Sequence, residues 1–220
     1  MTAGSQGMHS GAAQPFRNII PGMGNIVAEL ADRTVSDRHV AYAAEIRALL
    51  DAALEVMRSD DTIDPRVTDI VSTAGLSNQA FYRHFRGKDE LLLALLADGR
   101  ERLTTTVERR MARATDDAAR VRAWVEVVLA QARDAKAAAA TRPFVANADR
   151  LGQAHPEEAE RSRTRLVAPL AVVVGDDDAV AVYNLAMGAA HDAIIERRVP
   201  TNRDVEHIVH FALKGCGLGN

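Results

Sequence analysis

The chain has 220 residues, of which 47% are apolar and only 4% aromatic, and its net charge is −3. This length can bury a substantial core in one or two domains, and the slight negative charge excludes a uniformly basic nucleic-acid coat, so any DNA affinity has to come from a local patch. The single cysteine, Cys216, excludes an intrachain disulfide framework and fits a reducing cytoplasm, where we expect the protein to act. No apolar run approaches the roughly 18 residues of a membrane helix, and the N-terminus lacks a signal-peptide layout, so we expect no membrane association.

Abundant alanine and leucine favour helices, and the apolar periodicity predicts an all-α fold of about nine helices. Residues 1–36 are expected to form a flexible extension, because glycine, serine and proline are frequent in their first part. Arg17 in this extension leaves open whether an arm there touches DNA. The first main helix is predicted from about Asp37 to Arg58. A loop follows, and Asp64-Pro65 is predicted to start the next helix, with Asp64 as its N-cap.

The segment from Val67 to Lys88 is predicted to form two short helices joined by a tight turn. The first helix has one apolar face, made of Val67, Ile70, Val71 and Ala74. Gly75 suits the left-handed conformation that ends a helix, and Ser77 is a favoured N-cap for the second helix. In that second helix Phe81 and Phe85 lie close together in angle, so we expect them to be its buried edge.

The opposite side of the second helix is predicted to be polar and basic. Gln79, Ala80 and Arg83 are expected there, with His84 on the flank. Positive charges come from Arg83, Arg86 and Lys88, and Tyr82 and His84 can also donate to phosphate oxygens; no acid stands between Ser77 and Lys88. Such a helix suits a DNA major groove, where side chains read base edges while cations meet phosphate. The pattern alone leaves a second interpretation open, a surface hairpin with a solvated basic face.

Four motifs in and beside this segment give the chain a family resemblance. They are Ile70, Ala74-Gly75-Leu76-Ser77, Phe81-Tyr82-Arg83-His84-Phe85 and Lys88-Asp89-Glu90-Leu91-Leu92. Over about 46–96 the chain resembles the DNA-binding domain of the TetR family of bacterial transcriptional regulators. The resemblance implies a helix-turn-helix domain at 37–87 and a divergent helical domain for ligand binding and dimerisation at 88–220.

The resemblance also implies contacts with double-stranded DNA at a palindromic operator. The residues that would make them are Arg66, Thr68, Ser77, Asn78, Gln79, Ala80, Tyr82, Arg83, His84 and Lys88. Gln79 and Ala80 depart from the usual family pattern of a small residue followed by threonine. Gln79 suits a bidentate contact to adenine and Ala80 a contact to a thymine methyl, so we expect the family's docking geometry with a different base sequence.

Six further helices are predicted in the second half, at about 88–113, 117–140, 144–151, 157–174, 176–198 and 202–214. Gly99 lies inside the first of them and is a candidate flexible joint, since glycine costs roughly 1 kcal/mol relative to alanine in a helix. Pro143 is expected to interrupt the helical pattern and Pro169 to kink a later helix.

The resemblance implies that the last two helices form a four-helix bundle with a second copy of the chain. Small residues at Gly188, Ala189 and Ala190 would permit close helix contact there; the alternative is that these faces only close the monomer core. Candidates for the wall of an effector pocket are Trp124, Val128, Gln131, Phe144, Asn147, Tyr183, Met187 and His191. Each is also compatible with a core role. The mostly apolar set predicts an apolar or amphipathic small molecule.

The sequence gives no support for an enzyme. It has no glycine-rich phosphate loop, no CxxC and no HExxH motif. Asp204, His207 and His210 share a helical face that would suit a metal, but a solvated face explains them as well, and we expect neither metal nor cofactor. The leading hypothesis is a repressor released from its operator by an effector. Two alternatives remain: a helical DNA-binding protein without an effector, and a ligand-binding or enzymatic domain whose helix-turn-helix does not bind DNA.

Overall fold

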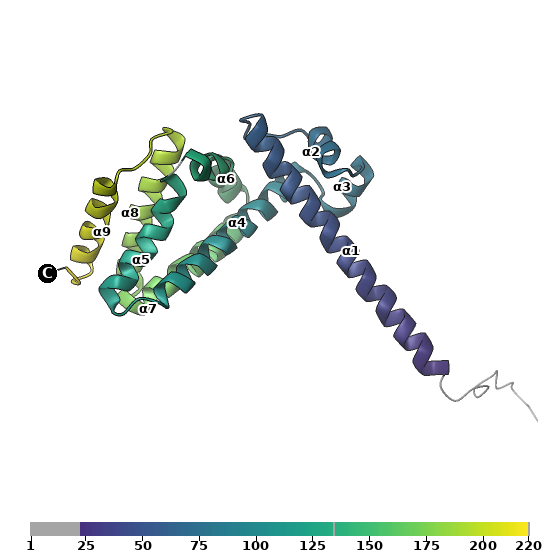
Figure 1. Ribbon diagram of the computed structural model, residues 1–220, viewed down its shortest axis with the longest axis horizontal. Helices are drawn as coiled ribbons and strands as arrows, with labels where there is room; N and C mark the ends of the chain where they lie inside the picture. The colour runs from purple at the N-terminus through teal and green to yellow at the C-terminus, as the bar shows by residue number, and fades with distance from the viewer. Residues whose placement is uncertain (1–22, 134, 220) are drawn as a thin grey trace, which may run out of the picture. The chain divides into compact units, whose positions relative to one another are not determined.

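The computed structural model describes residues 23–133 and 135–219, and within these ranges the chain is helical with short connections (Figure 1). The α-helices are α1 (Met23–Ser59), α2 (Val67–Ala74), α3 (Asn78–His84), α4 (Lys88–Met111), α5 (Asp117–Leu129), α6 (Ala135–Ala154), α7 (Pro156–Val174), α8 (Asp176–Ile195) and α9 (Asn202–Gly215), with a 3-10 turn, η1 (Ala130–Ala132), after α5. The prediction of an all-α fold is confirmed. None of these helices is long and apolar enough to cross a membrane.

The chain divides into two compact units, Met1–Ala44 and Glu45–Asn220. The first helix begins at Met23 and not near Asp37, because no proline stands between Pro21 and Pro65 and the intervening residues include good helix formers. The flexible extension and the arm at Arg17 were predicted for a stretch of which residues 1–22 lie outside the described part of the chain.

Two large hydrophobic cores and a small cluster of Ala132, Ala138, Ala193 and Ile194 lie in the second unit. The first core joins the end of α1, from Leu49 to Met57, to α2, α3, the start of α4 and Leu151 of α6. The second joins the end of α4 to α5, α7, α8 and α9, with Trp124 at its centre. Helix α4 contributes to both cores, through Leu91–Leu96 at one end and Val107 and Met111 at the other. Helix α4 is therefore the element that these two cores share.

The predicted boundaries around α5 and α6 are wrong. The helix that starts at Asp117 ends at Leu129 and does not continue to 140, and α6 runs without interruption through Pro143. A proline removes one backbone donor and crowds the preceding turn, and α6 tolerates both at Pro143, whose ring is buried. Asn147 Nδ2 also donates to the Pro143 carbonyl oxygen at 3.0 Å. Helix α7 runs through Pro169 as well, and the kink there stays a prediction.

Candidate nucleic-acid interface and ligand cavity

The turn between α2 and α3 is built as its sequence predicts. Gly75 has φ 66°, the left-handed conformation, and its N–H donates to Ser72 O at 3.2 Å while the next N–H, of Leu76, donates to Val71 O at 2.9 Å. Ser77 then caps α3, its Oγ accepting from the N–H of Ala80 at 3.1 Å. These bonds satisfy groups that a helix end leaves unpaired, and they fix the angle between the two helices.

Two phenylalanines anchor α3 to the first core. Phe81 and Phe85 are 0% and 5% exposed, and their ring centroids lie 5.7 Å apart. Burial of each such ring contributes about 1.5–3 kcal/mol, so the orientation of this two-turn helix is well determined. Its solvent side carries four predicted DNA contacts, namely Asn78, Gln79, Tyr82 and Arg83.

Two predicted contacts on α3 do not face solvent. Ala80 is only 5% exposed, so the buried side of this short helix is wider than its two phenylalanines alone. The side chain of His84 is fully buried, and its Nε2 lies 2.5 Å from Glu45 Oε2 on α1. Ala80 and His84 therefore support the position of α3 and are not available to base edges or phosphates.

The same carboxylate also reaches the exposed side of α3. Arg83 Nη2 donates to Glu45 Oε2 at 2.5 Å, so an acid distant in sequence faces one of the three cations. The hydrogen bonds from His84 and then Arg83 hold the pKa of Glu45 below its usual value of 4.5. Glu45 stays charged and competes with any phosphate that approaches Arg83.

The start of α2 differs from the prediction. The helix begins at Val67, and Arg66 is its N-cap, with the N–H groups of Asp69 and Ile70 donating to Arg66 O at 3.1 Å. Asp64 does not cap it, since the N-cap position is held by Arg66 and the Asp64 carboxylate forms an ion pair with Lys88. Arg66 and Thr68 are both exposed at this end of α2, as the predicted DNA contacts require.

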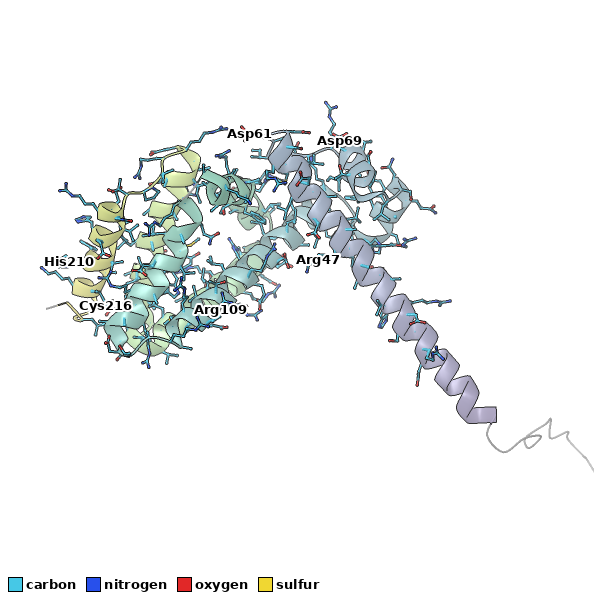
Figure 2. All side chains as sticks on the ribbon, in the orientation of Figure 1. Arg47, Asp61, Asp69, Arg109, His210 and Cys216 are labelled. Carbon is cyan, nitrogen blue, oxygen red and sulfur yellow. The ribbon has the colours of Figure 1, made fainter. Side chains whose placement is uncertain are left out.

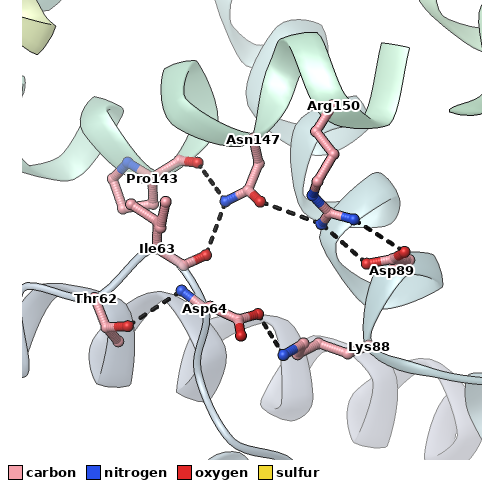
Figure 3. A network of polar contacts seen from close by, with 8 residues as sticks. All are labelled: Thr62, Ile63, Asp64, Lys88, Asp89, Pro143, Asn147 and Arg150. Carbon is pink, nitrogen blue, oxygen red and sulfur yellow. Dashed lines mark hydrogen bonds and ion pairs between the residues drawn. The ribbon is translucent and has the colours of Figure 1, made fainter. Parts of the chain in front are cut away.

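A polar network joins α6 to the loop before α2 and to the start of α4 (Figure 3). Asn147 Nδ2 donates to Ile63 O at 2.9 Å, and Arg150 forms a bidentate ion pair with Asp89 at 2.9 and 3.0 Å. In the same network Asp64 forms an ion pair with Lys88, the predicted phosphate contact. The cation at the start of α4 is thus held by an acid, as Arg83 is.

A second link reaches the turn after α1. Asp61, labelled in Figure 2, accepts from Arg142 of α6 at 2.9 Å and from Arg197, just after α8, at 2.6 Å. Arg197 and then Arg142 lower the pKa of this carboxyl. Both Asp61 and Arg197 have positive φ, 45° and 56°, so their backbones adopt a conformation that non-glycine residues rarely take. The helix-turn-helix is therefore tied to α6 through Asp61, Ile63 and Asp89.

A cavity of about 950 Å³ opens between α1, α4, α6 and α8, with part of α5 and η1. Six of the eight predicted pocket residues line it: Val128, Gln131, Phe144, Tyr183, Met187 and His191. Gly99 also lines it, and a Cβ on Gly99 would lie 3.2 Å from Phe144 Cε1. The glycine that the sequence suggested as a joint thus allows α4 and the Phe144 ring of α6 to approach closely.

Trp124 and Asn147 were predicted to line the cavity, and they do not. Trp124 is fully buried, and its indole N–H donates to Leu166 O at 3.1 Å within the second core. Asn147 faces the loop before α2, as described above. The sequence analysis missed Arg100, which lines the cavity from α4. Arg100 follows Leu96 by four residues and precedes Leu103 by three, so it lies on the apolar side of the helix. This position in the sequence could have indicated a charge that faces the cavity.

Two large apolar residues of α8 and α9 are exposed. Phe211 is 63% exposed and Ile195 45%, whereas Gly188, which the sequence suggested for close helix contact, lines the cavity. On α9 the metal interpretation gains no support. Asp204 accepts from the Thr201 N–H and hydroxyl in a capping box, and no group of three metal-ligating side chains occurs in the described ranges.

Residues 49–95 match a family model described as bacterial regulatory proteins, tetR family. This segment contains the last turns of α1, all of α2 and α3, and the first turns of α4. It therefore covers the helix-turn-helix and the helices that support it. A search of curated proteins found no match.

Solved structures share the fold over most of both chains. A transcriptional regulator from Streptomyces coelicolor A3(2) superposes with a TM-score of 0.64 at 14% identity, over 78% of this chain and 98% of that one. LfrR from Mycobacterium smegmatis, a TetR-like regulator in complex with proflavine, gives 0.54 at 21% identity, over 80% and 97%. FadR from Bacillus subtilis, in complex with stearoyl-CoA, gives 0.59 at 13% identity, over 77% and 98%.

Proposed function

We propose that this chain, which belongs to the TetR family of bacterial transcriptional regulators, is a cytoplasmic repressor that binds a palindromic operator as a homodimer and leaves it when a small apolar or amphipathic molecule enters the cavity. One observation carries the proposal: Phe81 and Phe85 point inward and leave a polar, partly basic side of α3 exposed. Regulators of this family are not enzymes. We assign DNA binding to residues 37–87 and effector binding and dimerisation to residues 88–220.

The proposed DNA contacts follow from exposure. On α3, Asn78 and Gln79 are exposed at its N-terminal end, suited to base edges, and Tyr82 and Arg83 are suited to phosphate. On the flanks we assign Arg66, Thr68 and Lys88, and Ser77 acts as the cap. Phosphates replace Glu45 at Arg83 and Asp64 at Lys88, so binding exchanges two internal ion pairs for two contacts with DNA.

Dimerisation through α8 and α9 is supported by the exposed Phe211 and Ile195. A second copy would cover these side chains in an isologous interface and present a second α3. One short helix reads few base pairs, and two related by a two-fold axis read a palindrome.

The effector proposal is supported by the cavity and by two structural neighbours that hold small molecules with a large apolar part, the aromatic proflavine in LfrR and the amphipathic stearoyl-CoA in FadR. A volume of about 950 Å³ is within the range of small-molecule sites. Helix α6 lines this cavity through Phe144 and holds the helix-turn-helix through Asn147 and Arg150. A ligand that displaces α6 would shift the start of α4 and Lys88, to the extent that it binds one form more tightly than the other.

The test is selection of bound sequences from random duplex DNA with the full chain. We expect enrichment of a two-fold-symmetric site, with affinity that falls steeply as salt rises. No enriched sequence at either low or moderate salt would overturn the proposal. An asymmetric site would contradict the homodimer and leave DNA binding itself intact.

A further inference from the structure

We infer that the cavity takes a ligand with an anionic head, a carboxylate or a phosphate, on an apolar body, and that Arg100 binds this head. The inference rests on the proposed function, because it names the chemistry of the effector at the same cavity.

Arg100 is a half-buried cation that has no acidic partner among the side chains that the structure describes. It lies on α4 and lines both the cavity of about 950 Å³ and an adjoining one of about 770 Å³, and Leu96 and Ala148 are likewise common to both. The structure shows no ion pair of Arg100 with any residue of 23–133 or 135–219. A guanidinium that is partly removed from water without a partner is costly, and an anionic ligand would offset that cost.

The acids near Arg100 on α4 are already engaged. Asp98 forms ion pairs with Arg102 at 2.6 Å and Arg47 at 3.2 Å, and Glu101 forms one with Arg165 at 2.7 Å. Each of these acids is therefore paired with another arginine, and neither neutralises Arg100. The positive charge of Arg100 faces the cavity without an internal competitor, unlike Arg83 and Lys88 at the DNA-binding surface.

The other charges around the cavity lie at its rim. Arg58 and Arg102 have exposed side chains, and each already has an acidic partner, Glu55 and Asp98. Asp51 and Asp149 are exposed as well. Water screens exposed charges, whereas a charge at partial depth acts through a lower effective dielectric. The deeper arginine therefore determines the sign of the ligand's head more strongly than the rim acids do.

The rest of the lining suits an apolar body. The apolar side chains that line the cavity are Leu54, Leu96, Leu103, Val128, Phe144, Met187 and Ile194. The uncharged polar residues of the wall are Thr106, Gln131, Thr141, Asn184 and His191, of which Thr141 Oγ1 donates to Gln131 Oε1 at 3.3 Å. One unpaired cation in a mainly apolar wall is the complement of an amphipathic anion.

The test is calorimetric titration of the full chain, without DNA, with four probes of equal chain length below their micelle concentrations: decanoate, decyl phosphate, decanol and decyltrimethylammonium. We expect at least one of the two anions to bind saturably and roughly ten-fold to a hundred-fold more tightly than decanol, the range of a hydrogen bond to a charged group. Which anion binds more tightly identifies the head as carboxylate or phosphate. Decanol binding as tightly as both anions, tighter binding of the cation, or no binding of any probe would overturn the inference.

Arg100→Gln removes the charge and Arg102→Gln is the matched control, because it makes the same change at the exposed rim two residues away. We expect Arg100→Gln to abolish the preference for the anion over decanol and to leave decanol binding unchanged, which also shows that the variant is folded. Arg102→Gln should keep the preference. Equal anion preference in wild type and Arg100→Gln would overturn the assignment. Since no DNA is present, anion binding by a chain that selects no DNA sequence would refute the proposed function and leave this inference standing.

Discussion

Arg83 and Lys88 at the proposed DNA-binding surface each form an ion pair with an acid. Arg83→Ala and Lys88→Ala each delete one proposed phosphate contact, and each should weaken operator binding and lower the salt dependence of log K by about 0.9. Neither side chain is part of a hydrophobic core, so the variants should fold. Arg109→Ala, an exposed cation in the last turn of α4, is the control and should bind normally. Fluorescence anisotropy against salt measures this; normal binding by both variants would contradict the docking geometry.

Glu45 opposes DNA binding in the same geometry. Glu45→Gln removes the charge that holds Arg83, so we expect DNA affinity to rise several-fold at low salt, since a released cation gains a phosphate partner without losing an ion pair. Glu55→Gln makes the same change in net charge elsewhere on α1, where the acid pairs with Arg58, and should alter affinity less. Anisotropy titrations of both variants compare them. Equal gains would show a general charge effect and no specific release of Arg83.

The lowered pKa of Glu45 also predicts a pH dependence of stability. A carboxyl with a folded-state pKa below its unfolded value stabilises the fold above the usual value of 4.5, and this contribution disappears as the pH falls through the folded pKa. Wild type should therefore unfold at higher urea than Glu45→Gln at pH 5 and above, and the two midpoints should converge toward pH 3. A gap that is constant over this range would mean that the ion pair does not persist in solution.

The residues of the turn were predictable and Glu45 was not. Gly75 and Ser77 act within a few residues of their own positions, through local rules for helix ends. Glu45 is 38 residues from Arg83 and 39 from His84, and no periodicity links them. The burial of the His84 side chain was missed for the same reason, because its partner Glu45 comes from α1; the burial of Ala80 likewise depends on tertiary packing that the periodicity of α3 does not reveal.

Helices α4 and α6 approach each other at Gly99, and this contact predicts that a glycine-to-alanine substitution there changes stability differently from the same substitution at Gly152. Gly152→Ala in α6 would place Cβ 3.6 Å from Ala159, an ordinary contact, so it should stabilise the fold by about 0.5–1 kcal/mol through helix propensity. Gly99→Ala would gain the same propensity but place Cβ 3.2 Å from the Phe144 ring, which must shift. We expect a smaller gain or a loss, measured by urea unfolding. Equal stabilisation by both substitutions would show that Phe144 moves freely.

Helix boundaries in the second half of the chain were predictable where apolar periodicity is regular, and not where a proline lies inside a helix. The apolar stripes placed α4, α7, α8 and α9 within a few residues of their observed ends. The break after α5 was misplaced because Pro143 is a strong local helix breaker, whereas in the structure its ring is buried and α6 continues through it. The cavity wall was largely predicted from apolar and aromatic residues, and Arg100 was missed because a charge on an apolar stripe was not weighed as a ligand contact.

For the whole molecule, the proposed dimer predicts that substitution of one exposed apolar residue weakens dimerisation and substitution of another does not. Phe211 on α9 is 63% exposed and Val172 on α7 is 89% exposed, so neither is needed for the monomer core. Phe211→Glu should place two charges in the interface related by the two-fold axis, and a large aromatic at such a centre is commonly worth 2 kcal/mol or more, about a 30-fold rise in the dissociation constant. Val172→Glu makes the same kind of change outside α8 and α9 and should leave the dimer intact.

Sedimentation over a range of protein concentrations distinguishes these outcomes. Wild type and Val172→Glu should sediment as dimers where Phe211→Glu sediments as a folded monomer with an unchanged helical circular dichroism spectrum. The monomer should also bind a palindrome far more weakly, since it presents a single α3, while its binding to one isolated half-site should equal that of wild type per subunit. A Phe211→Glu protein that remains dimeric would place the interface elsewhere, and a wild type that is monomeric at micromolar concentration would exclude a dimer preassembled without DNA.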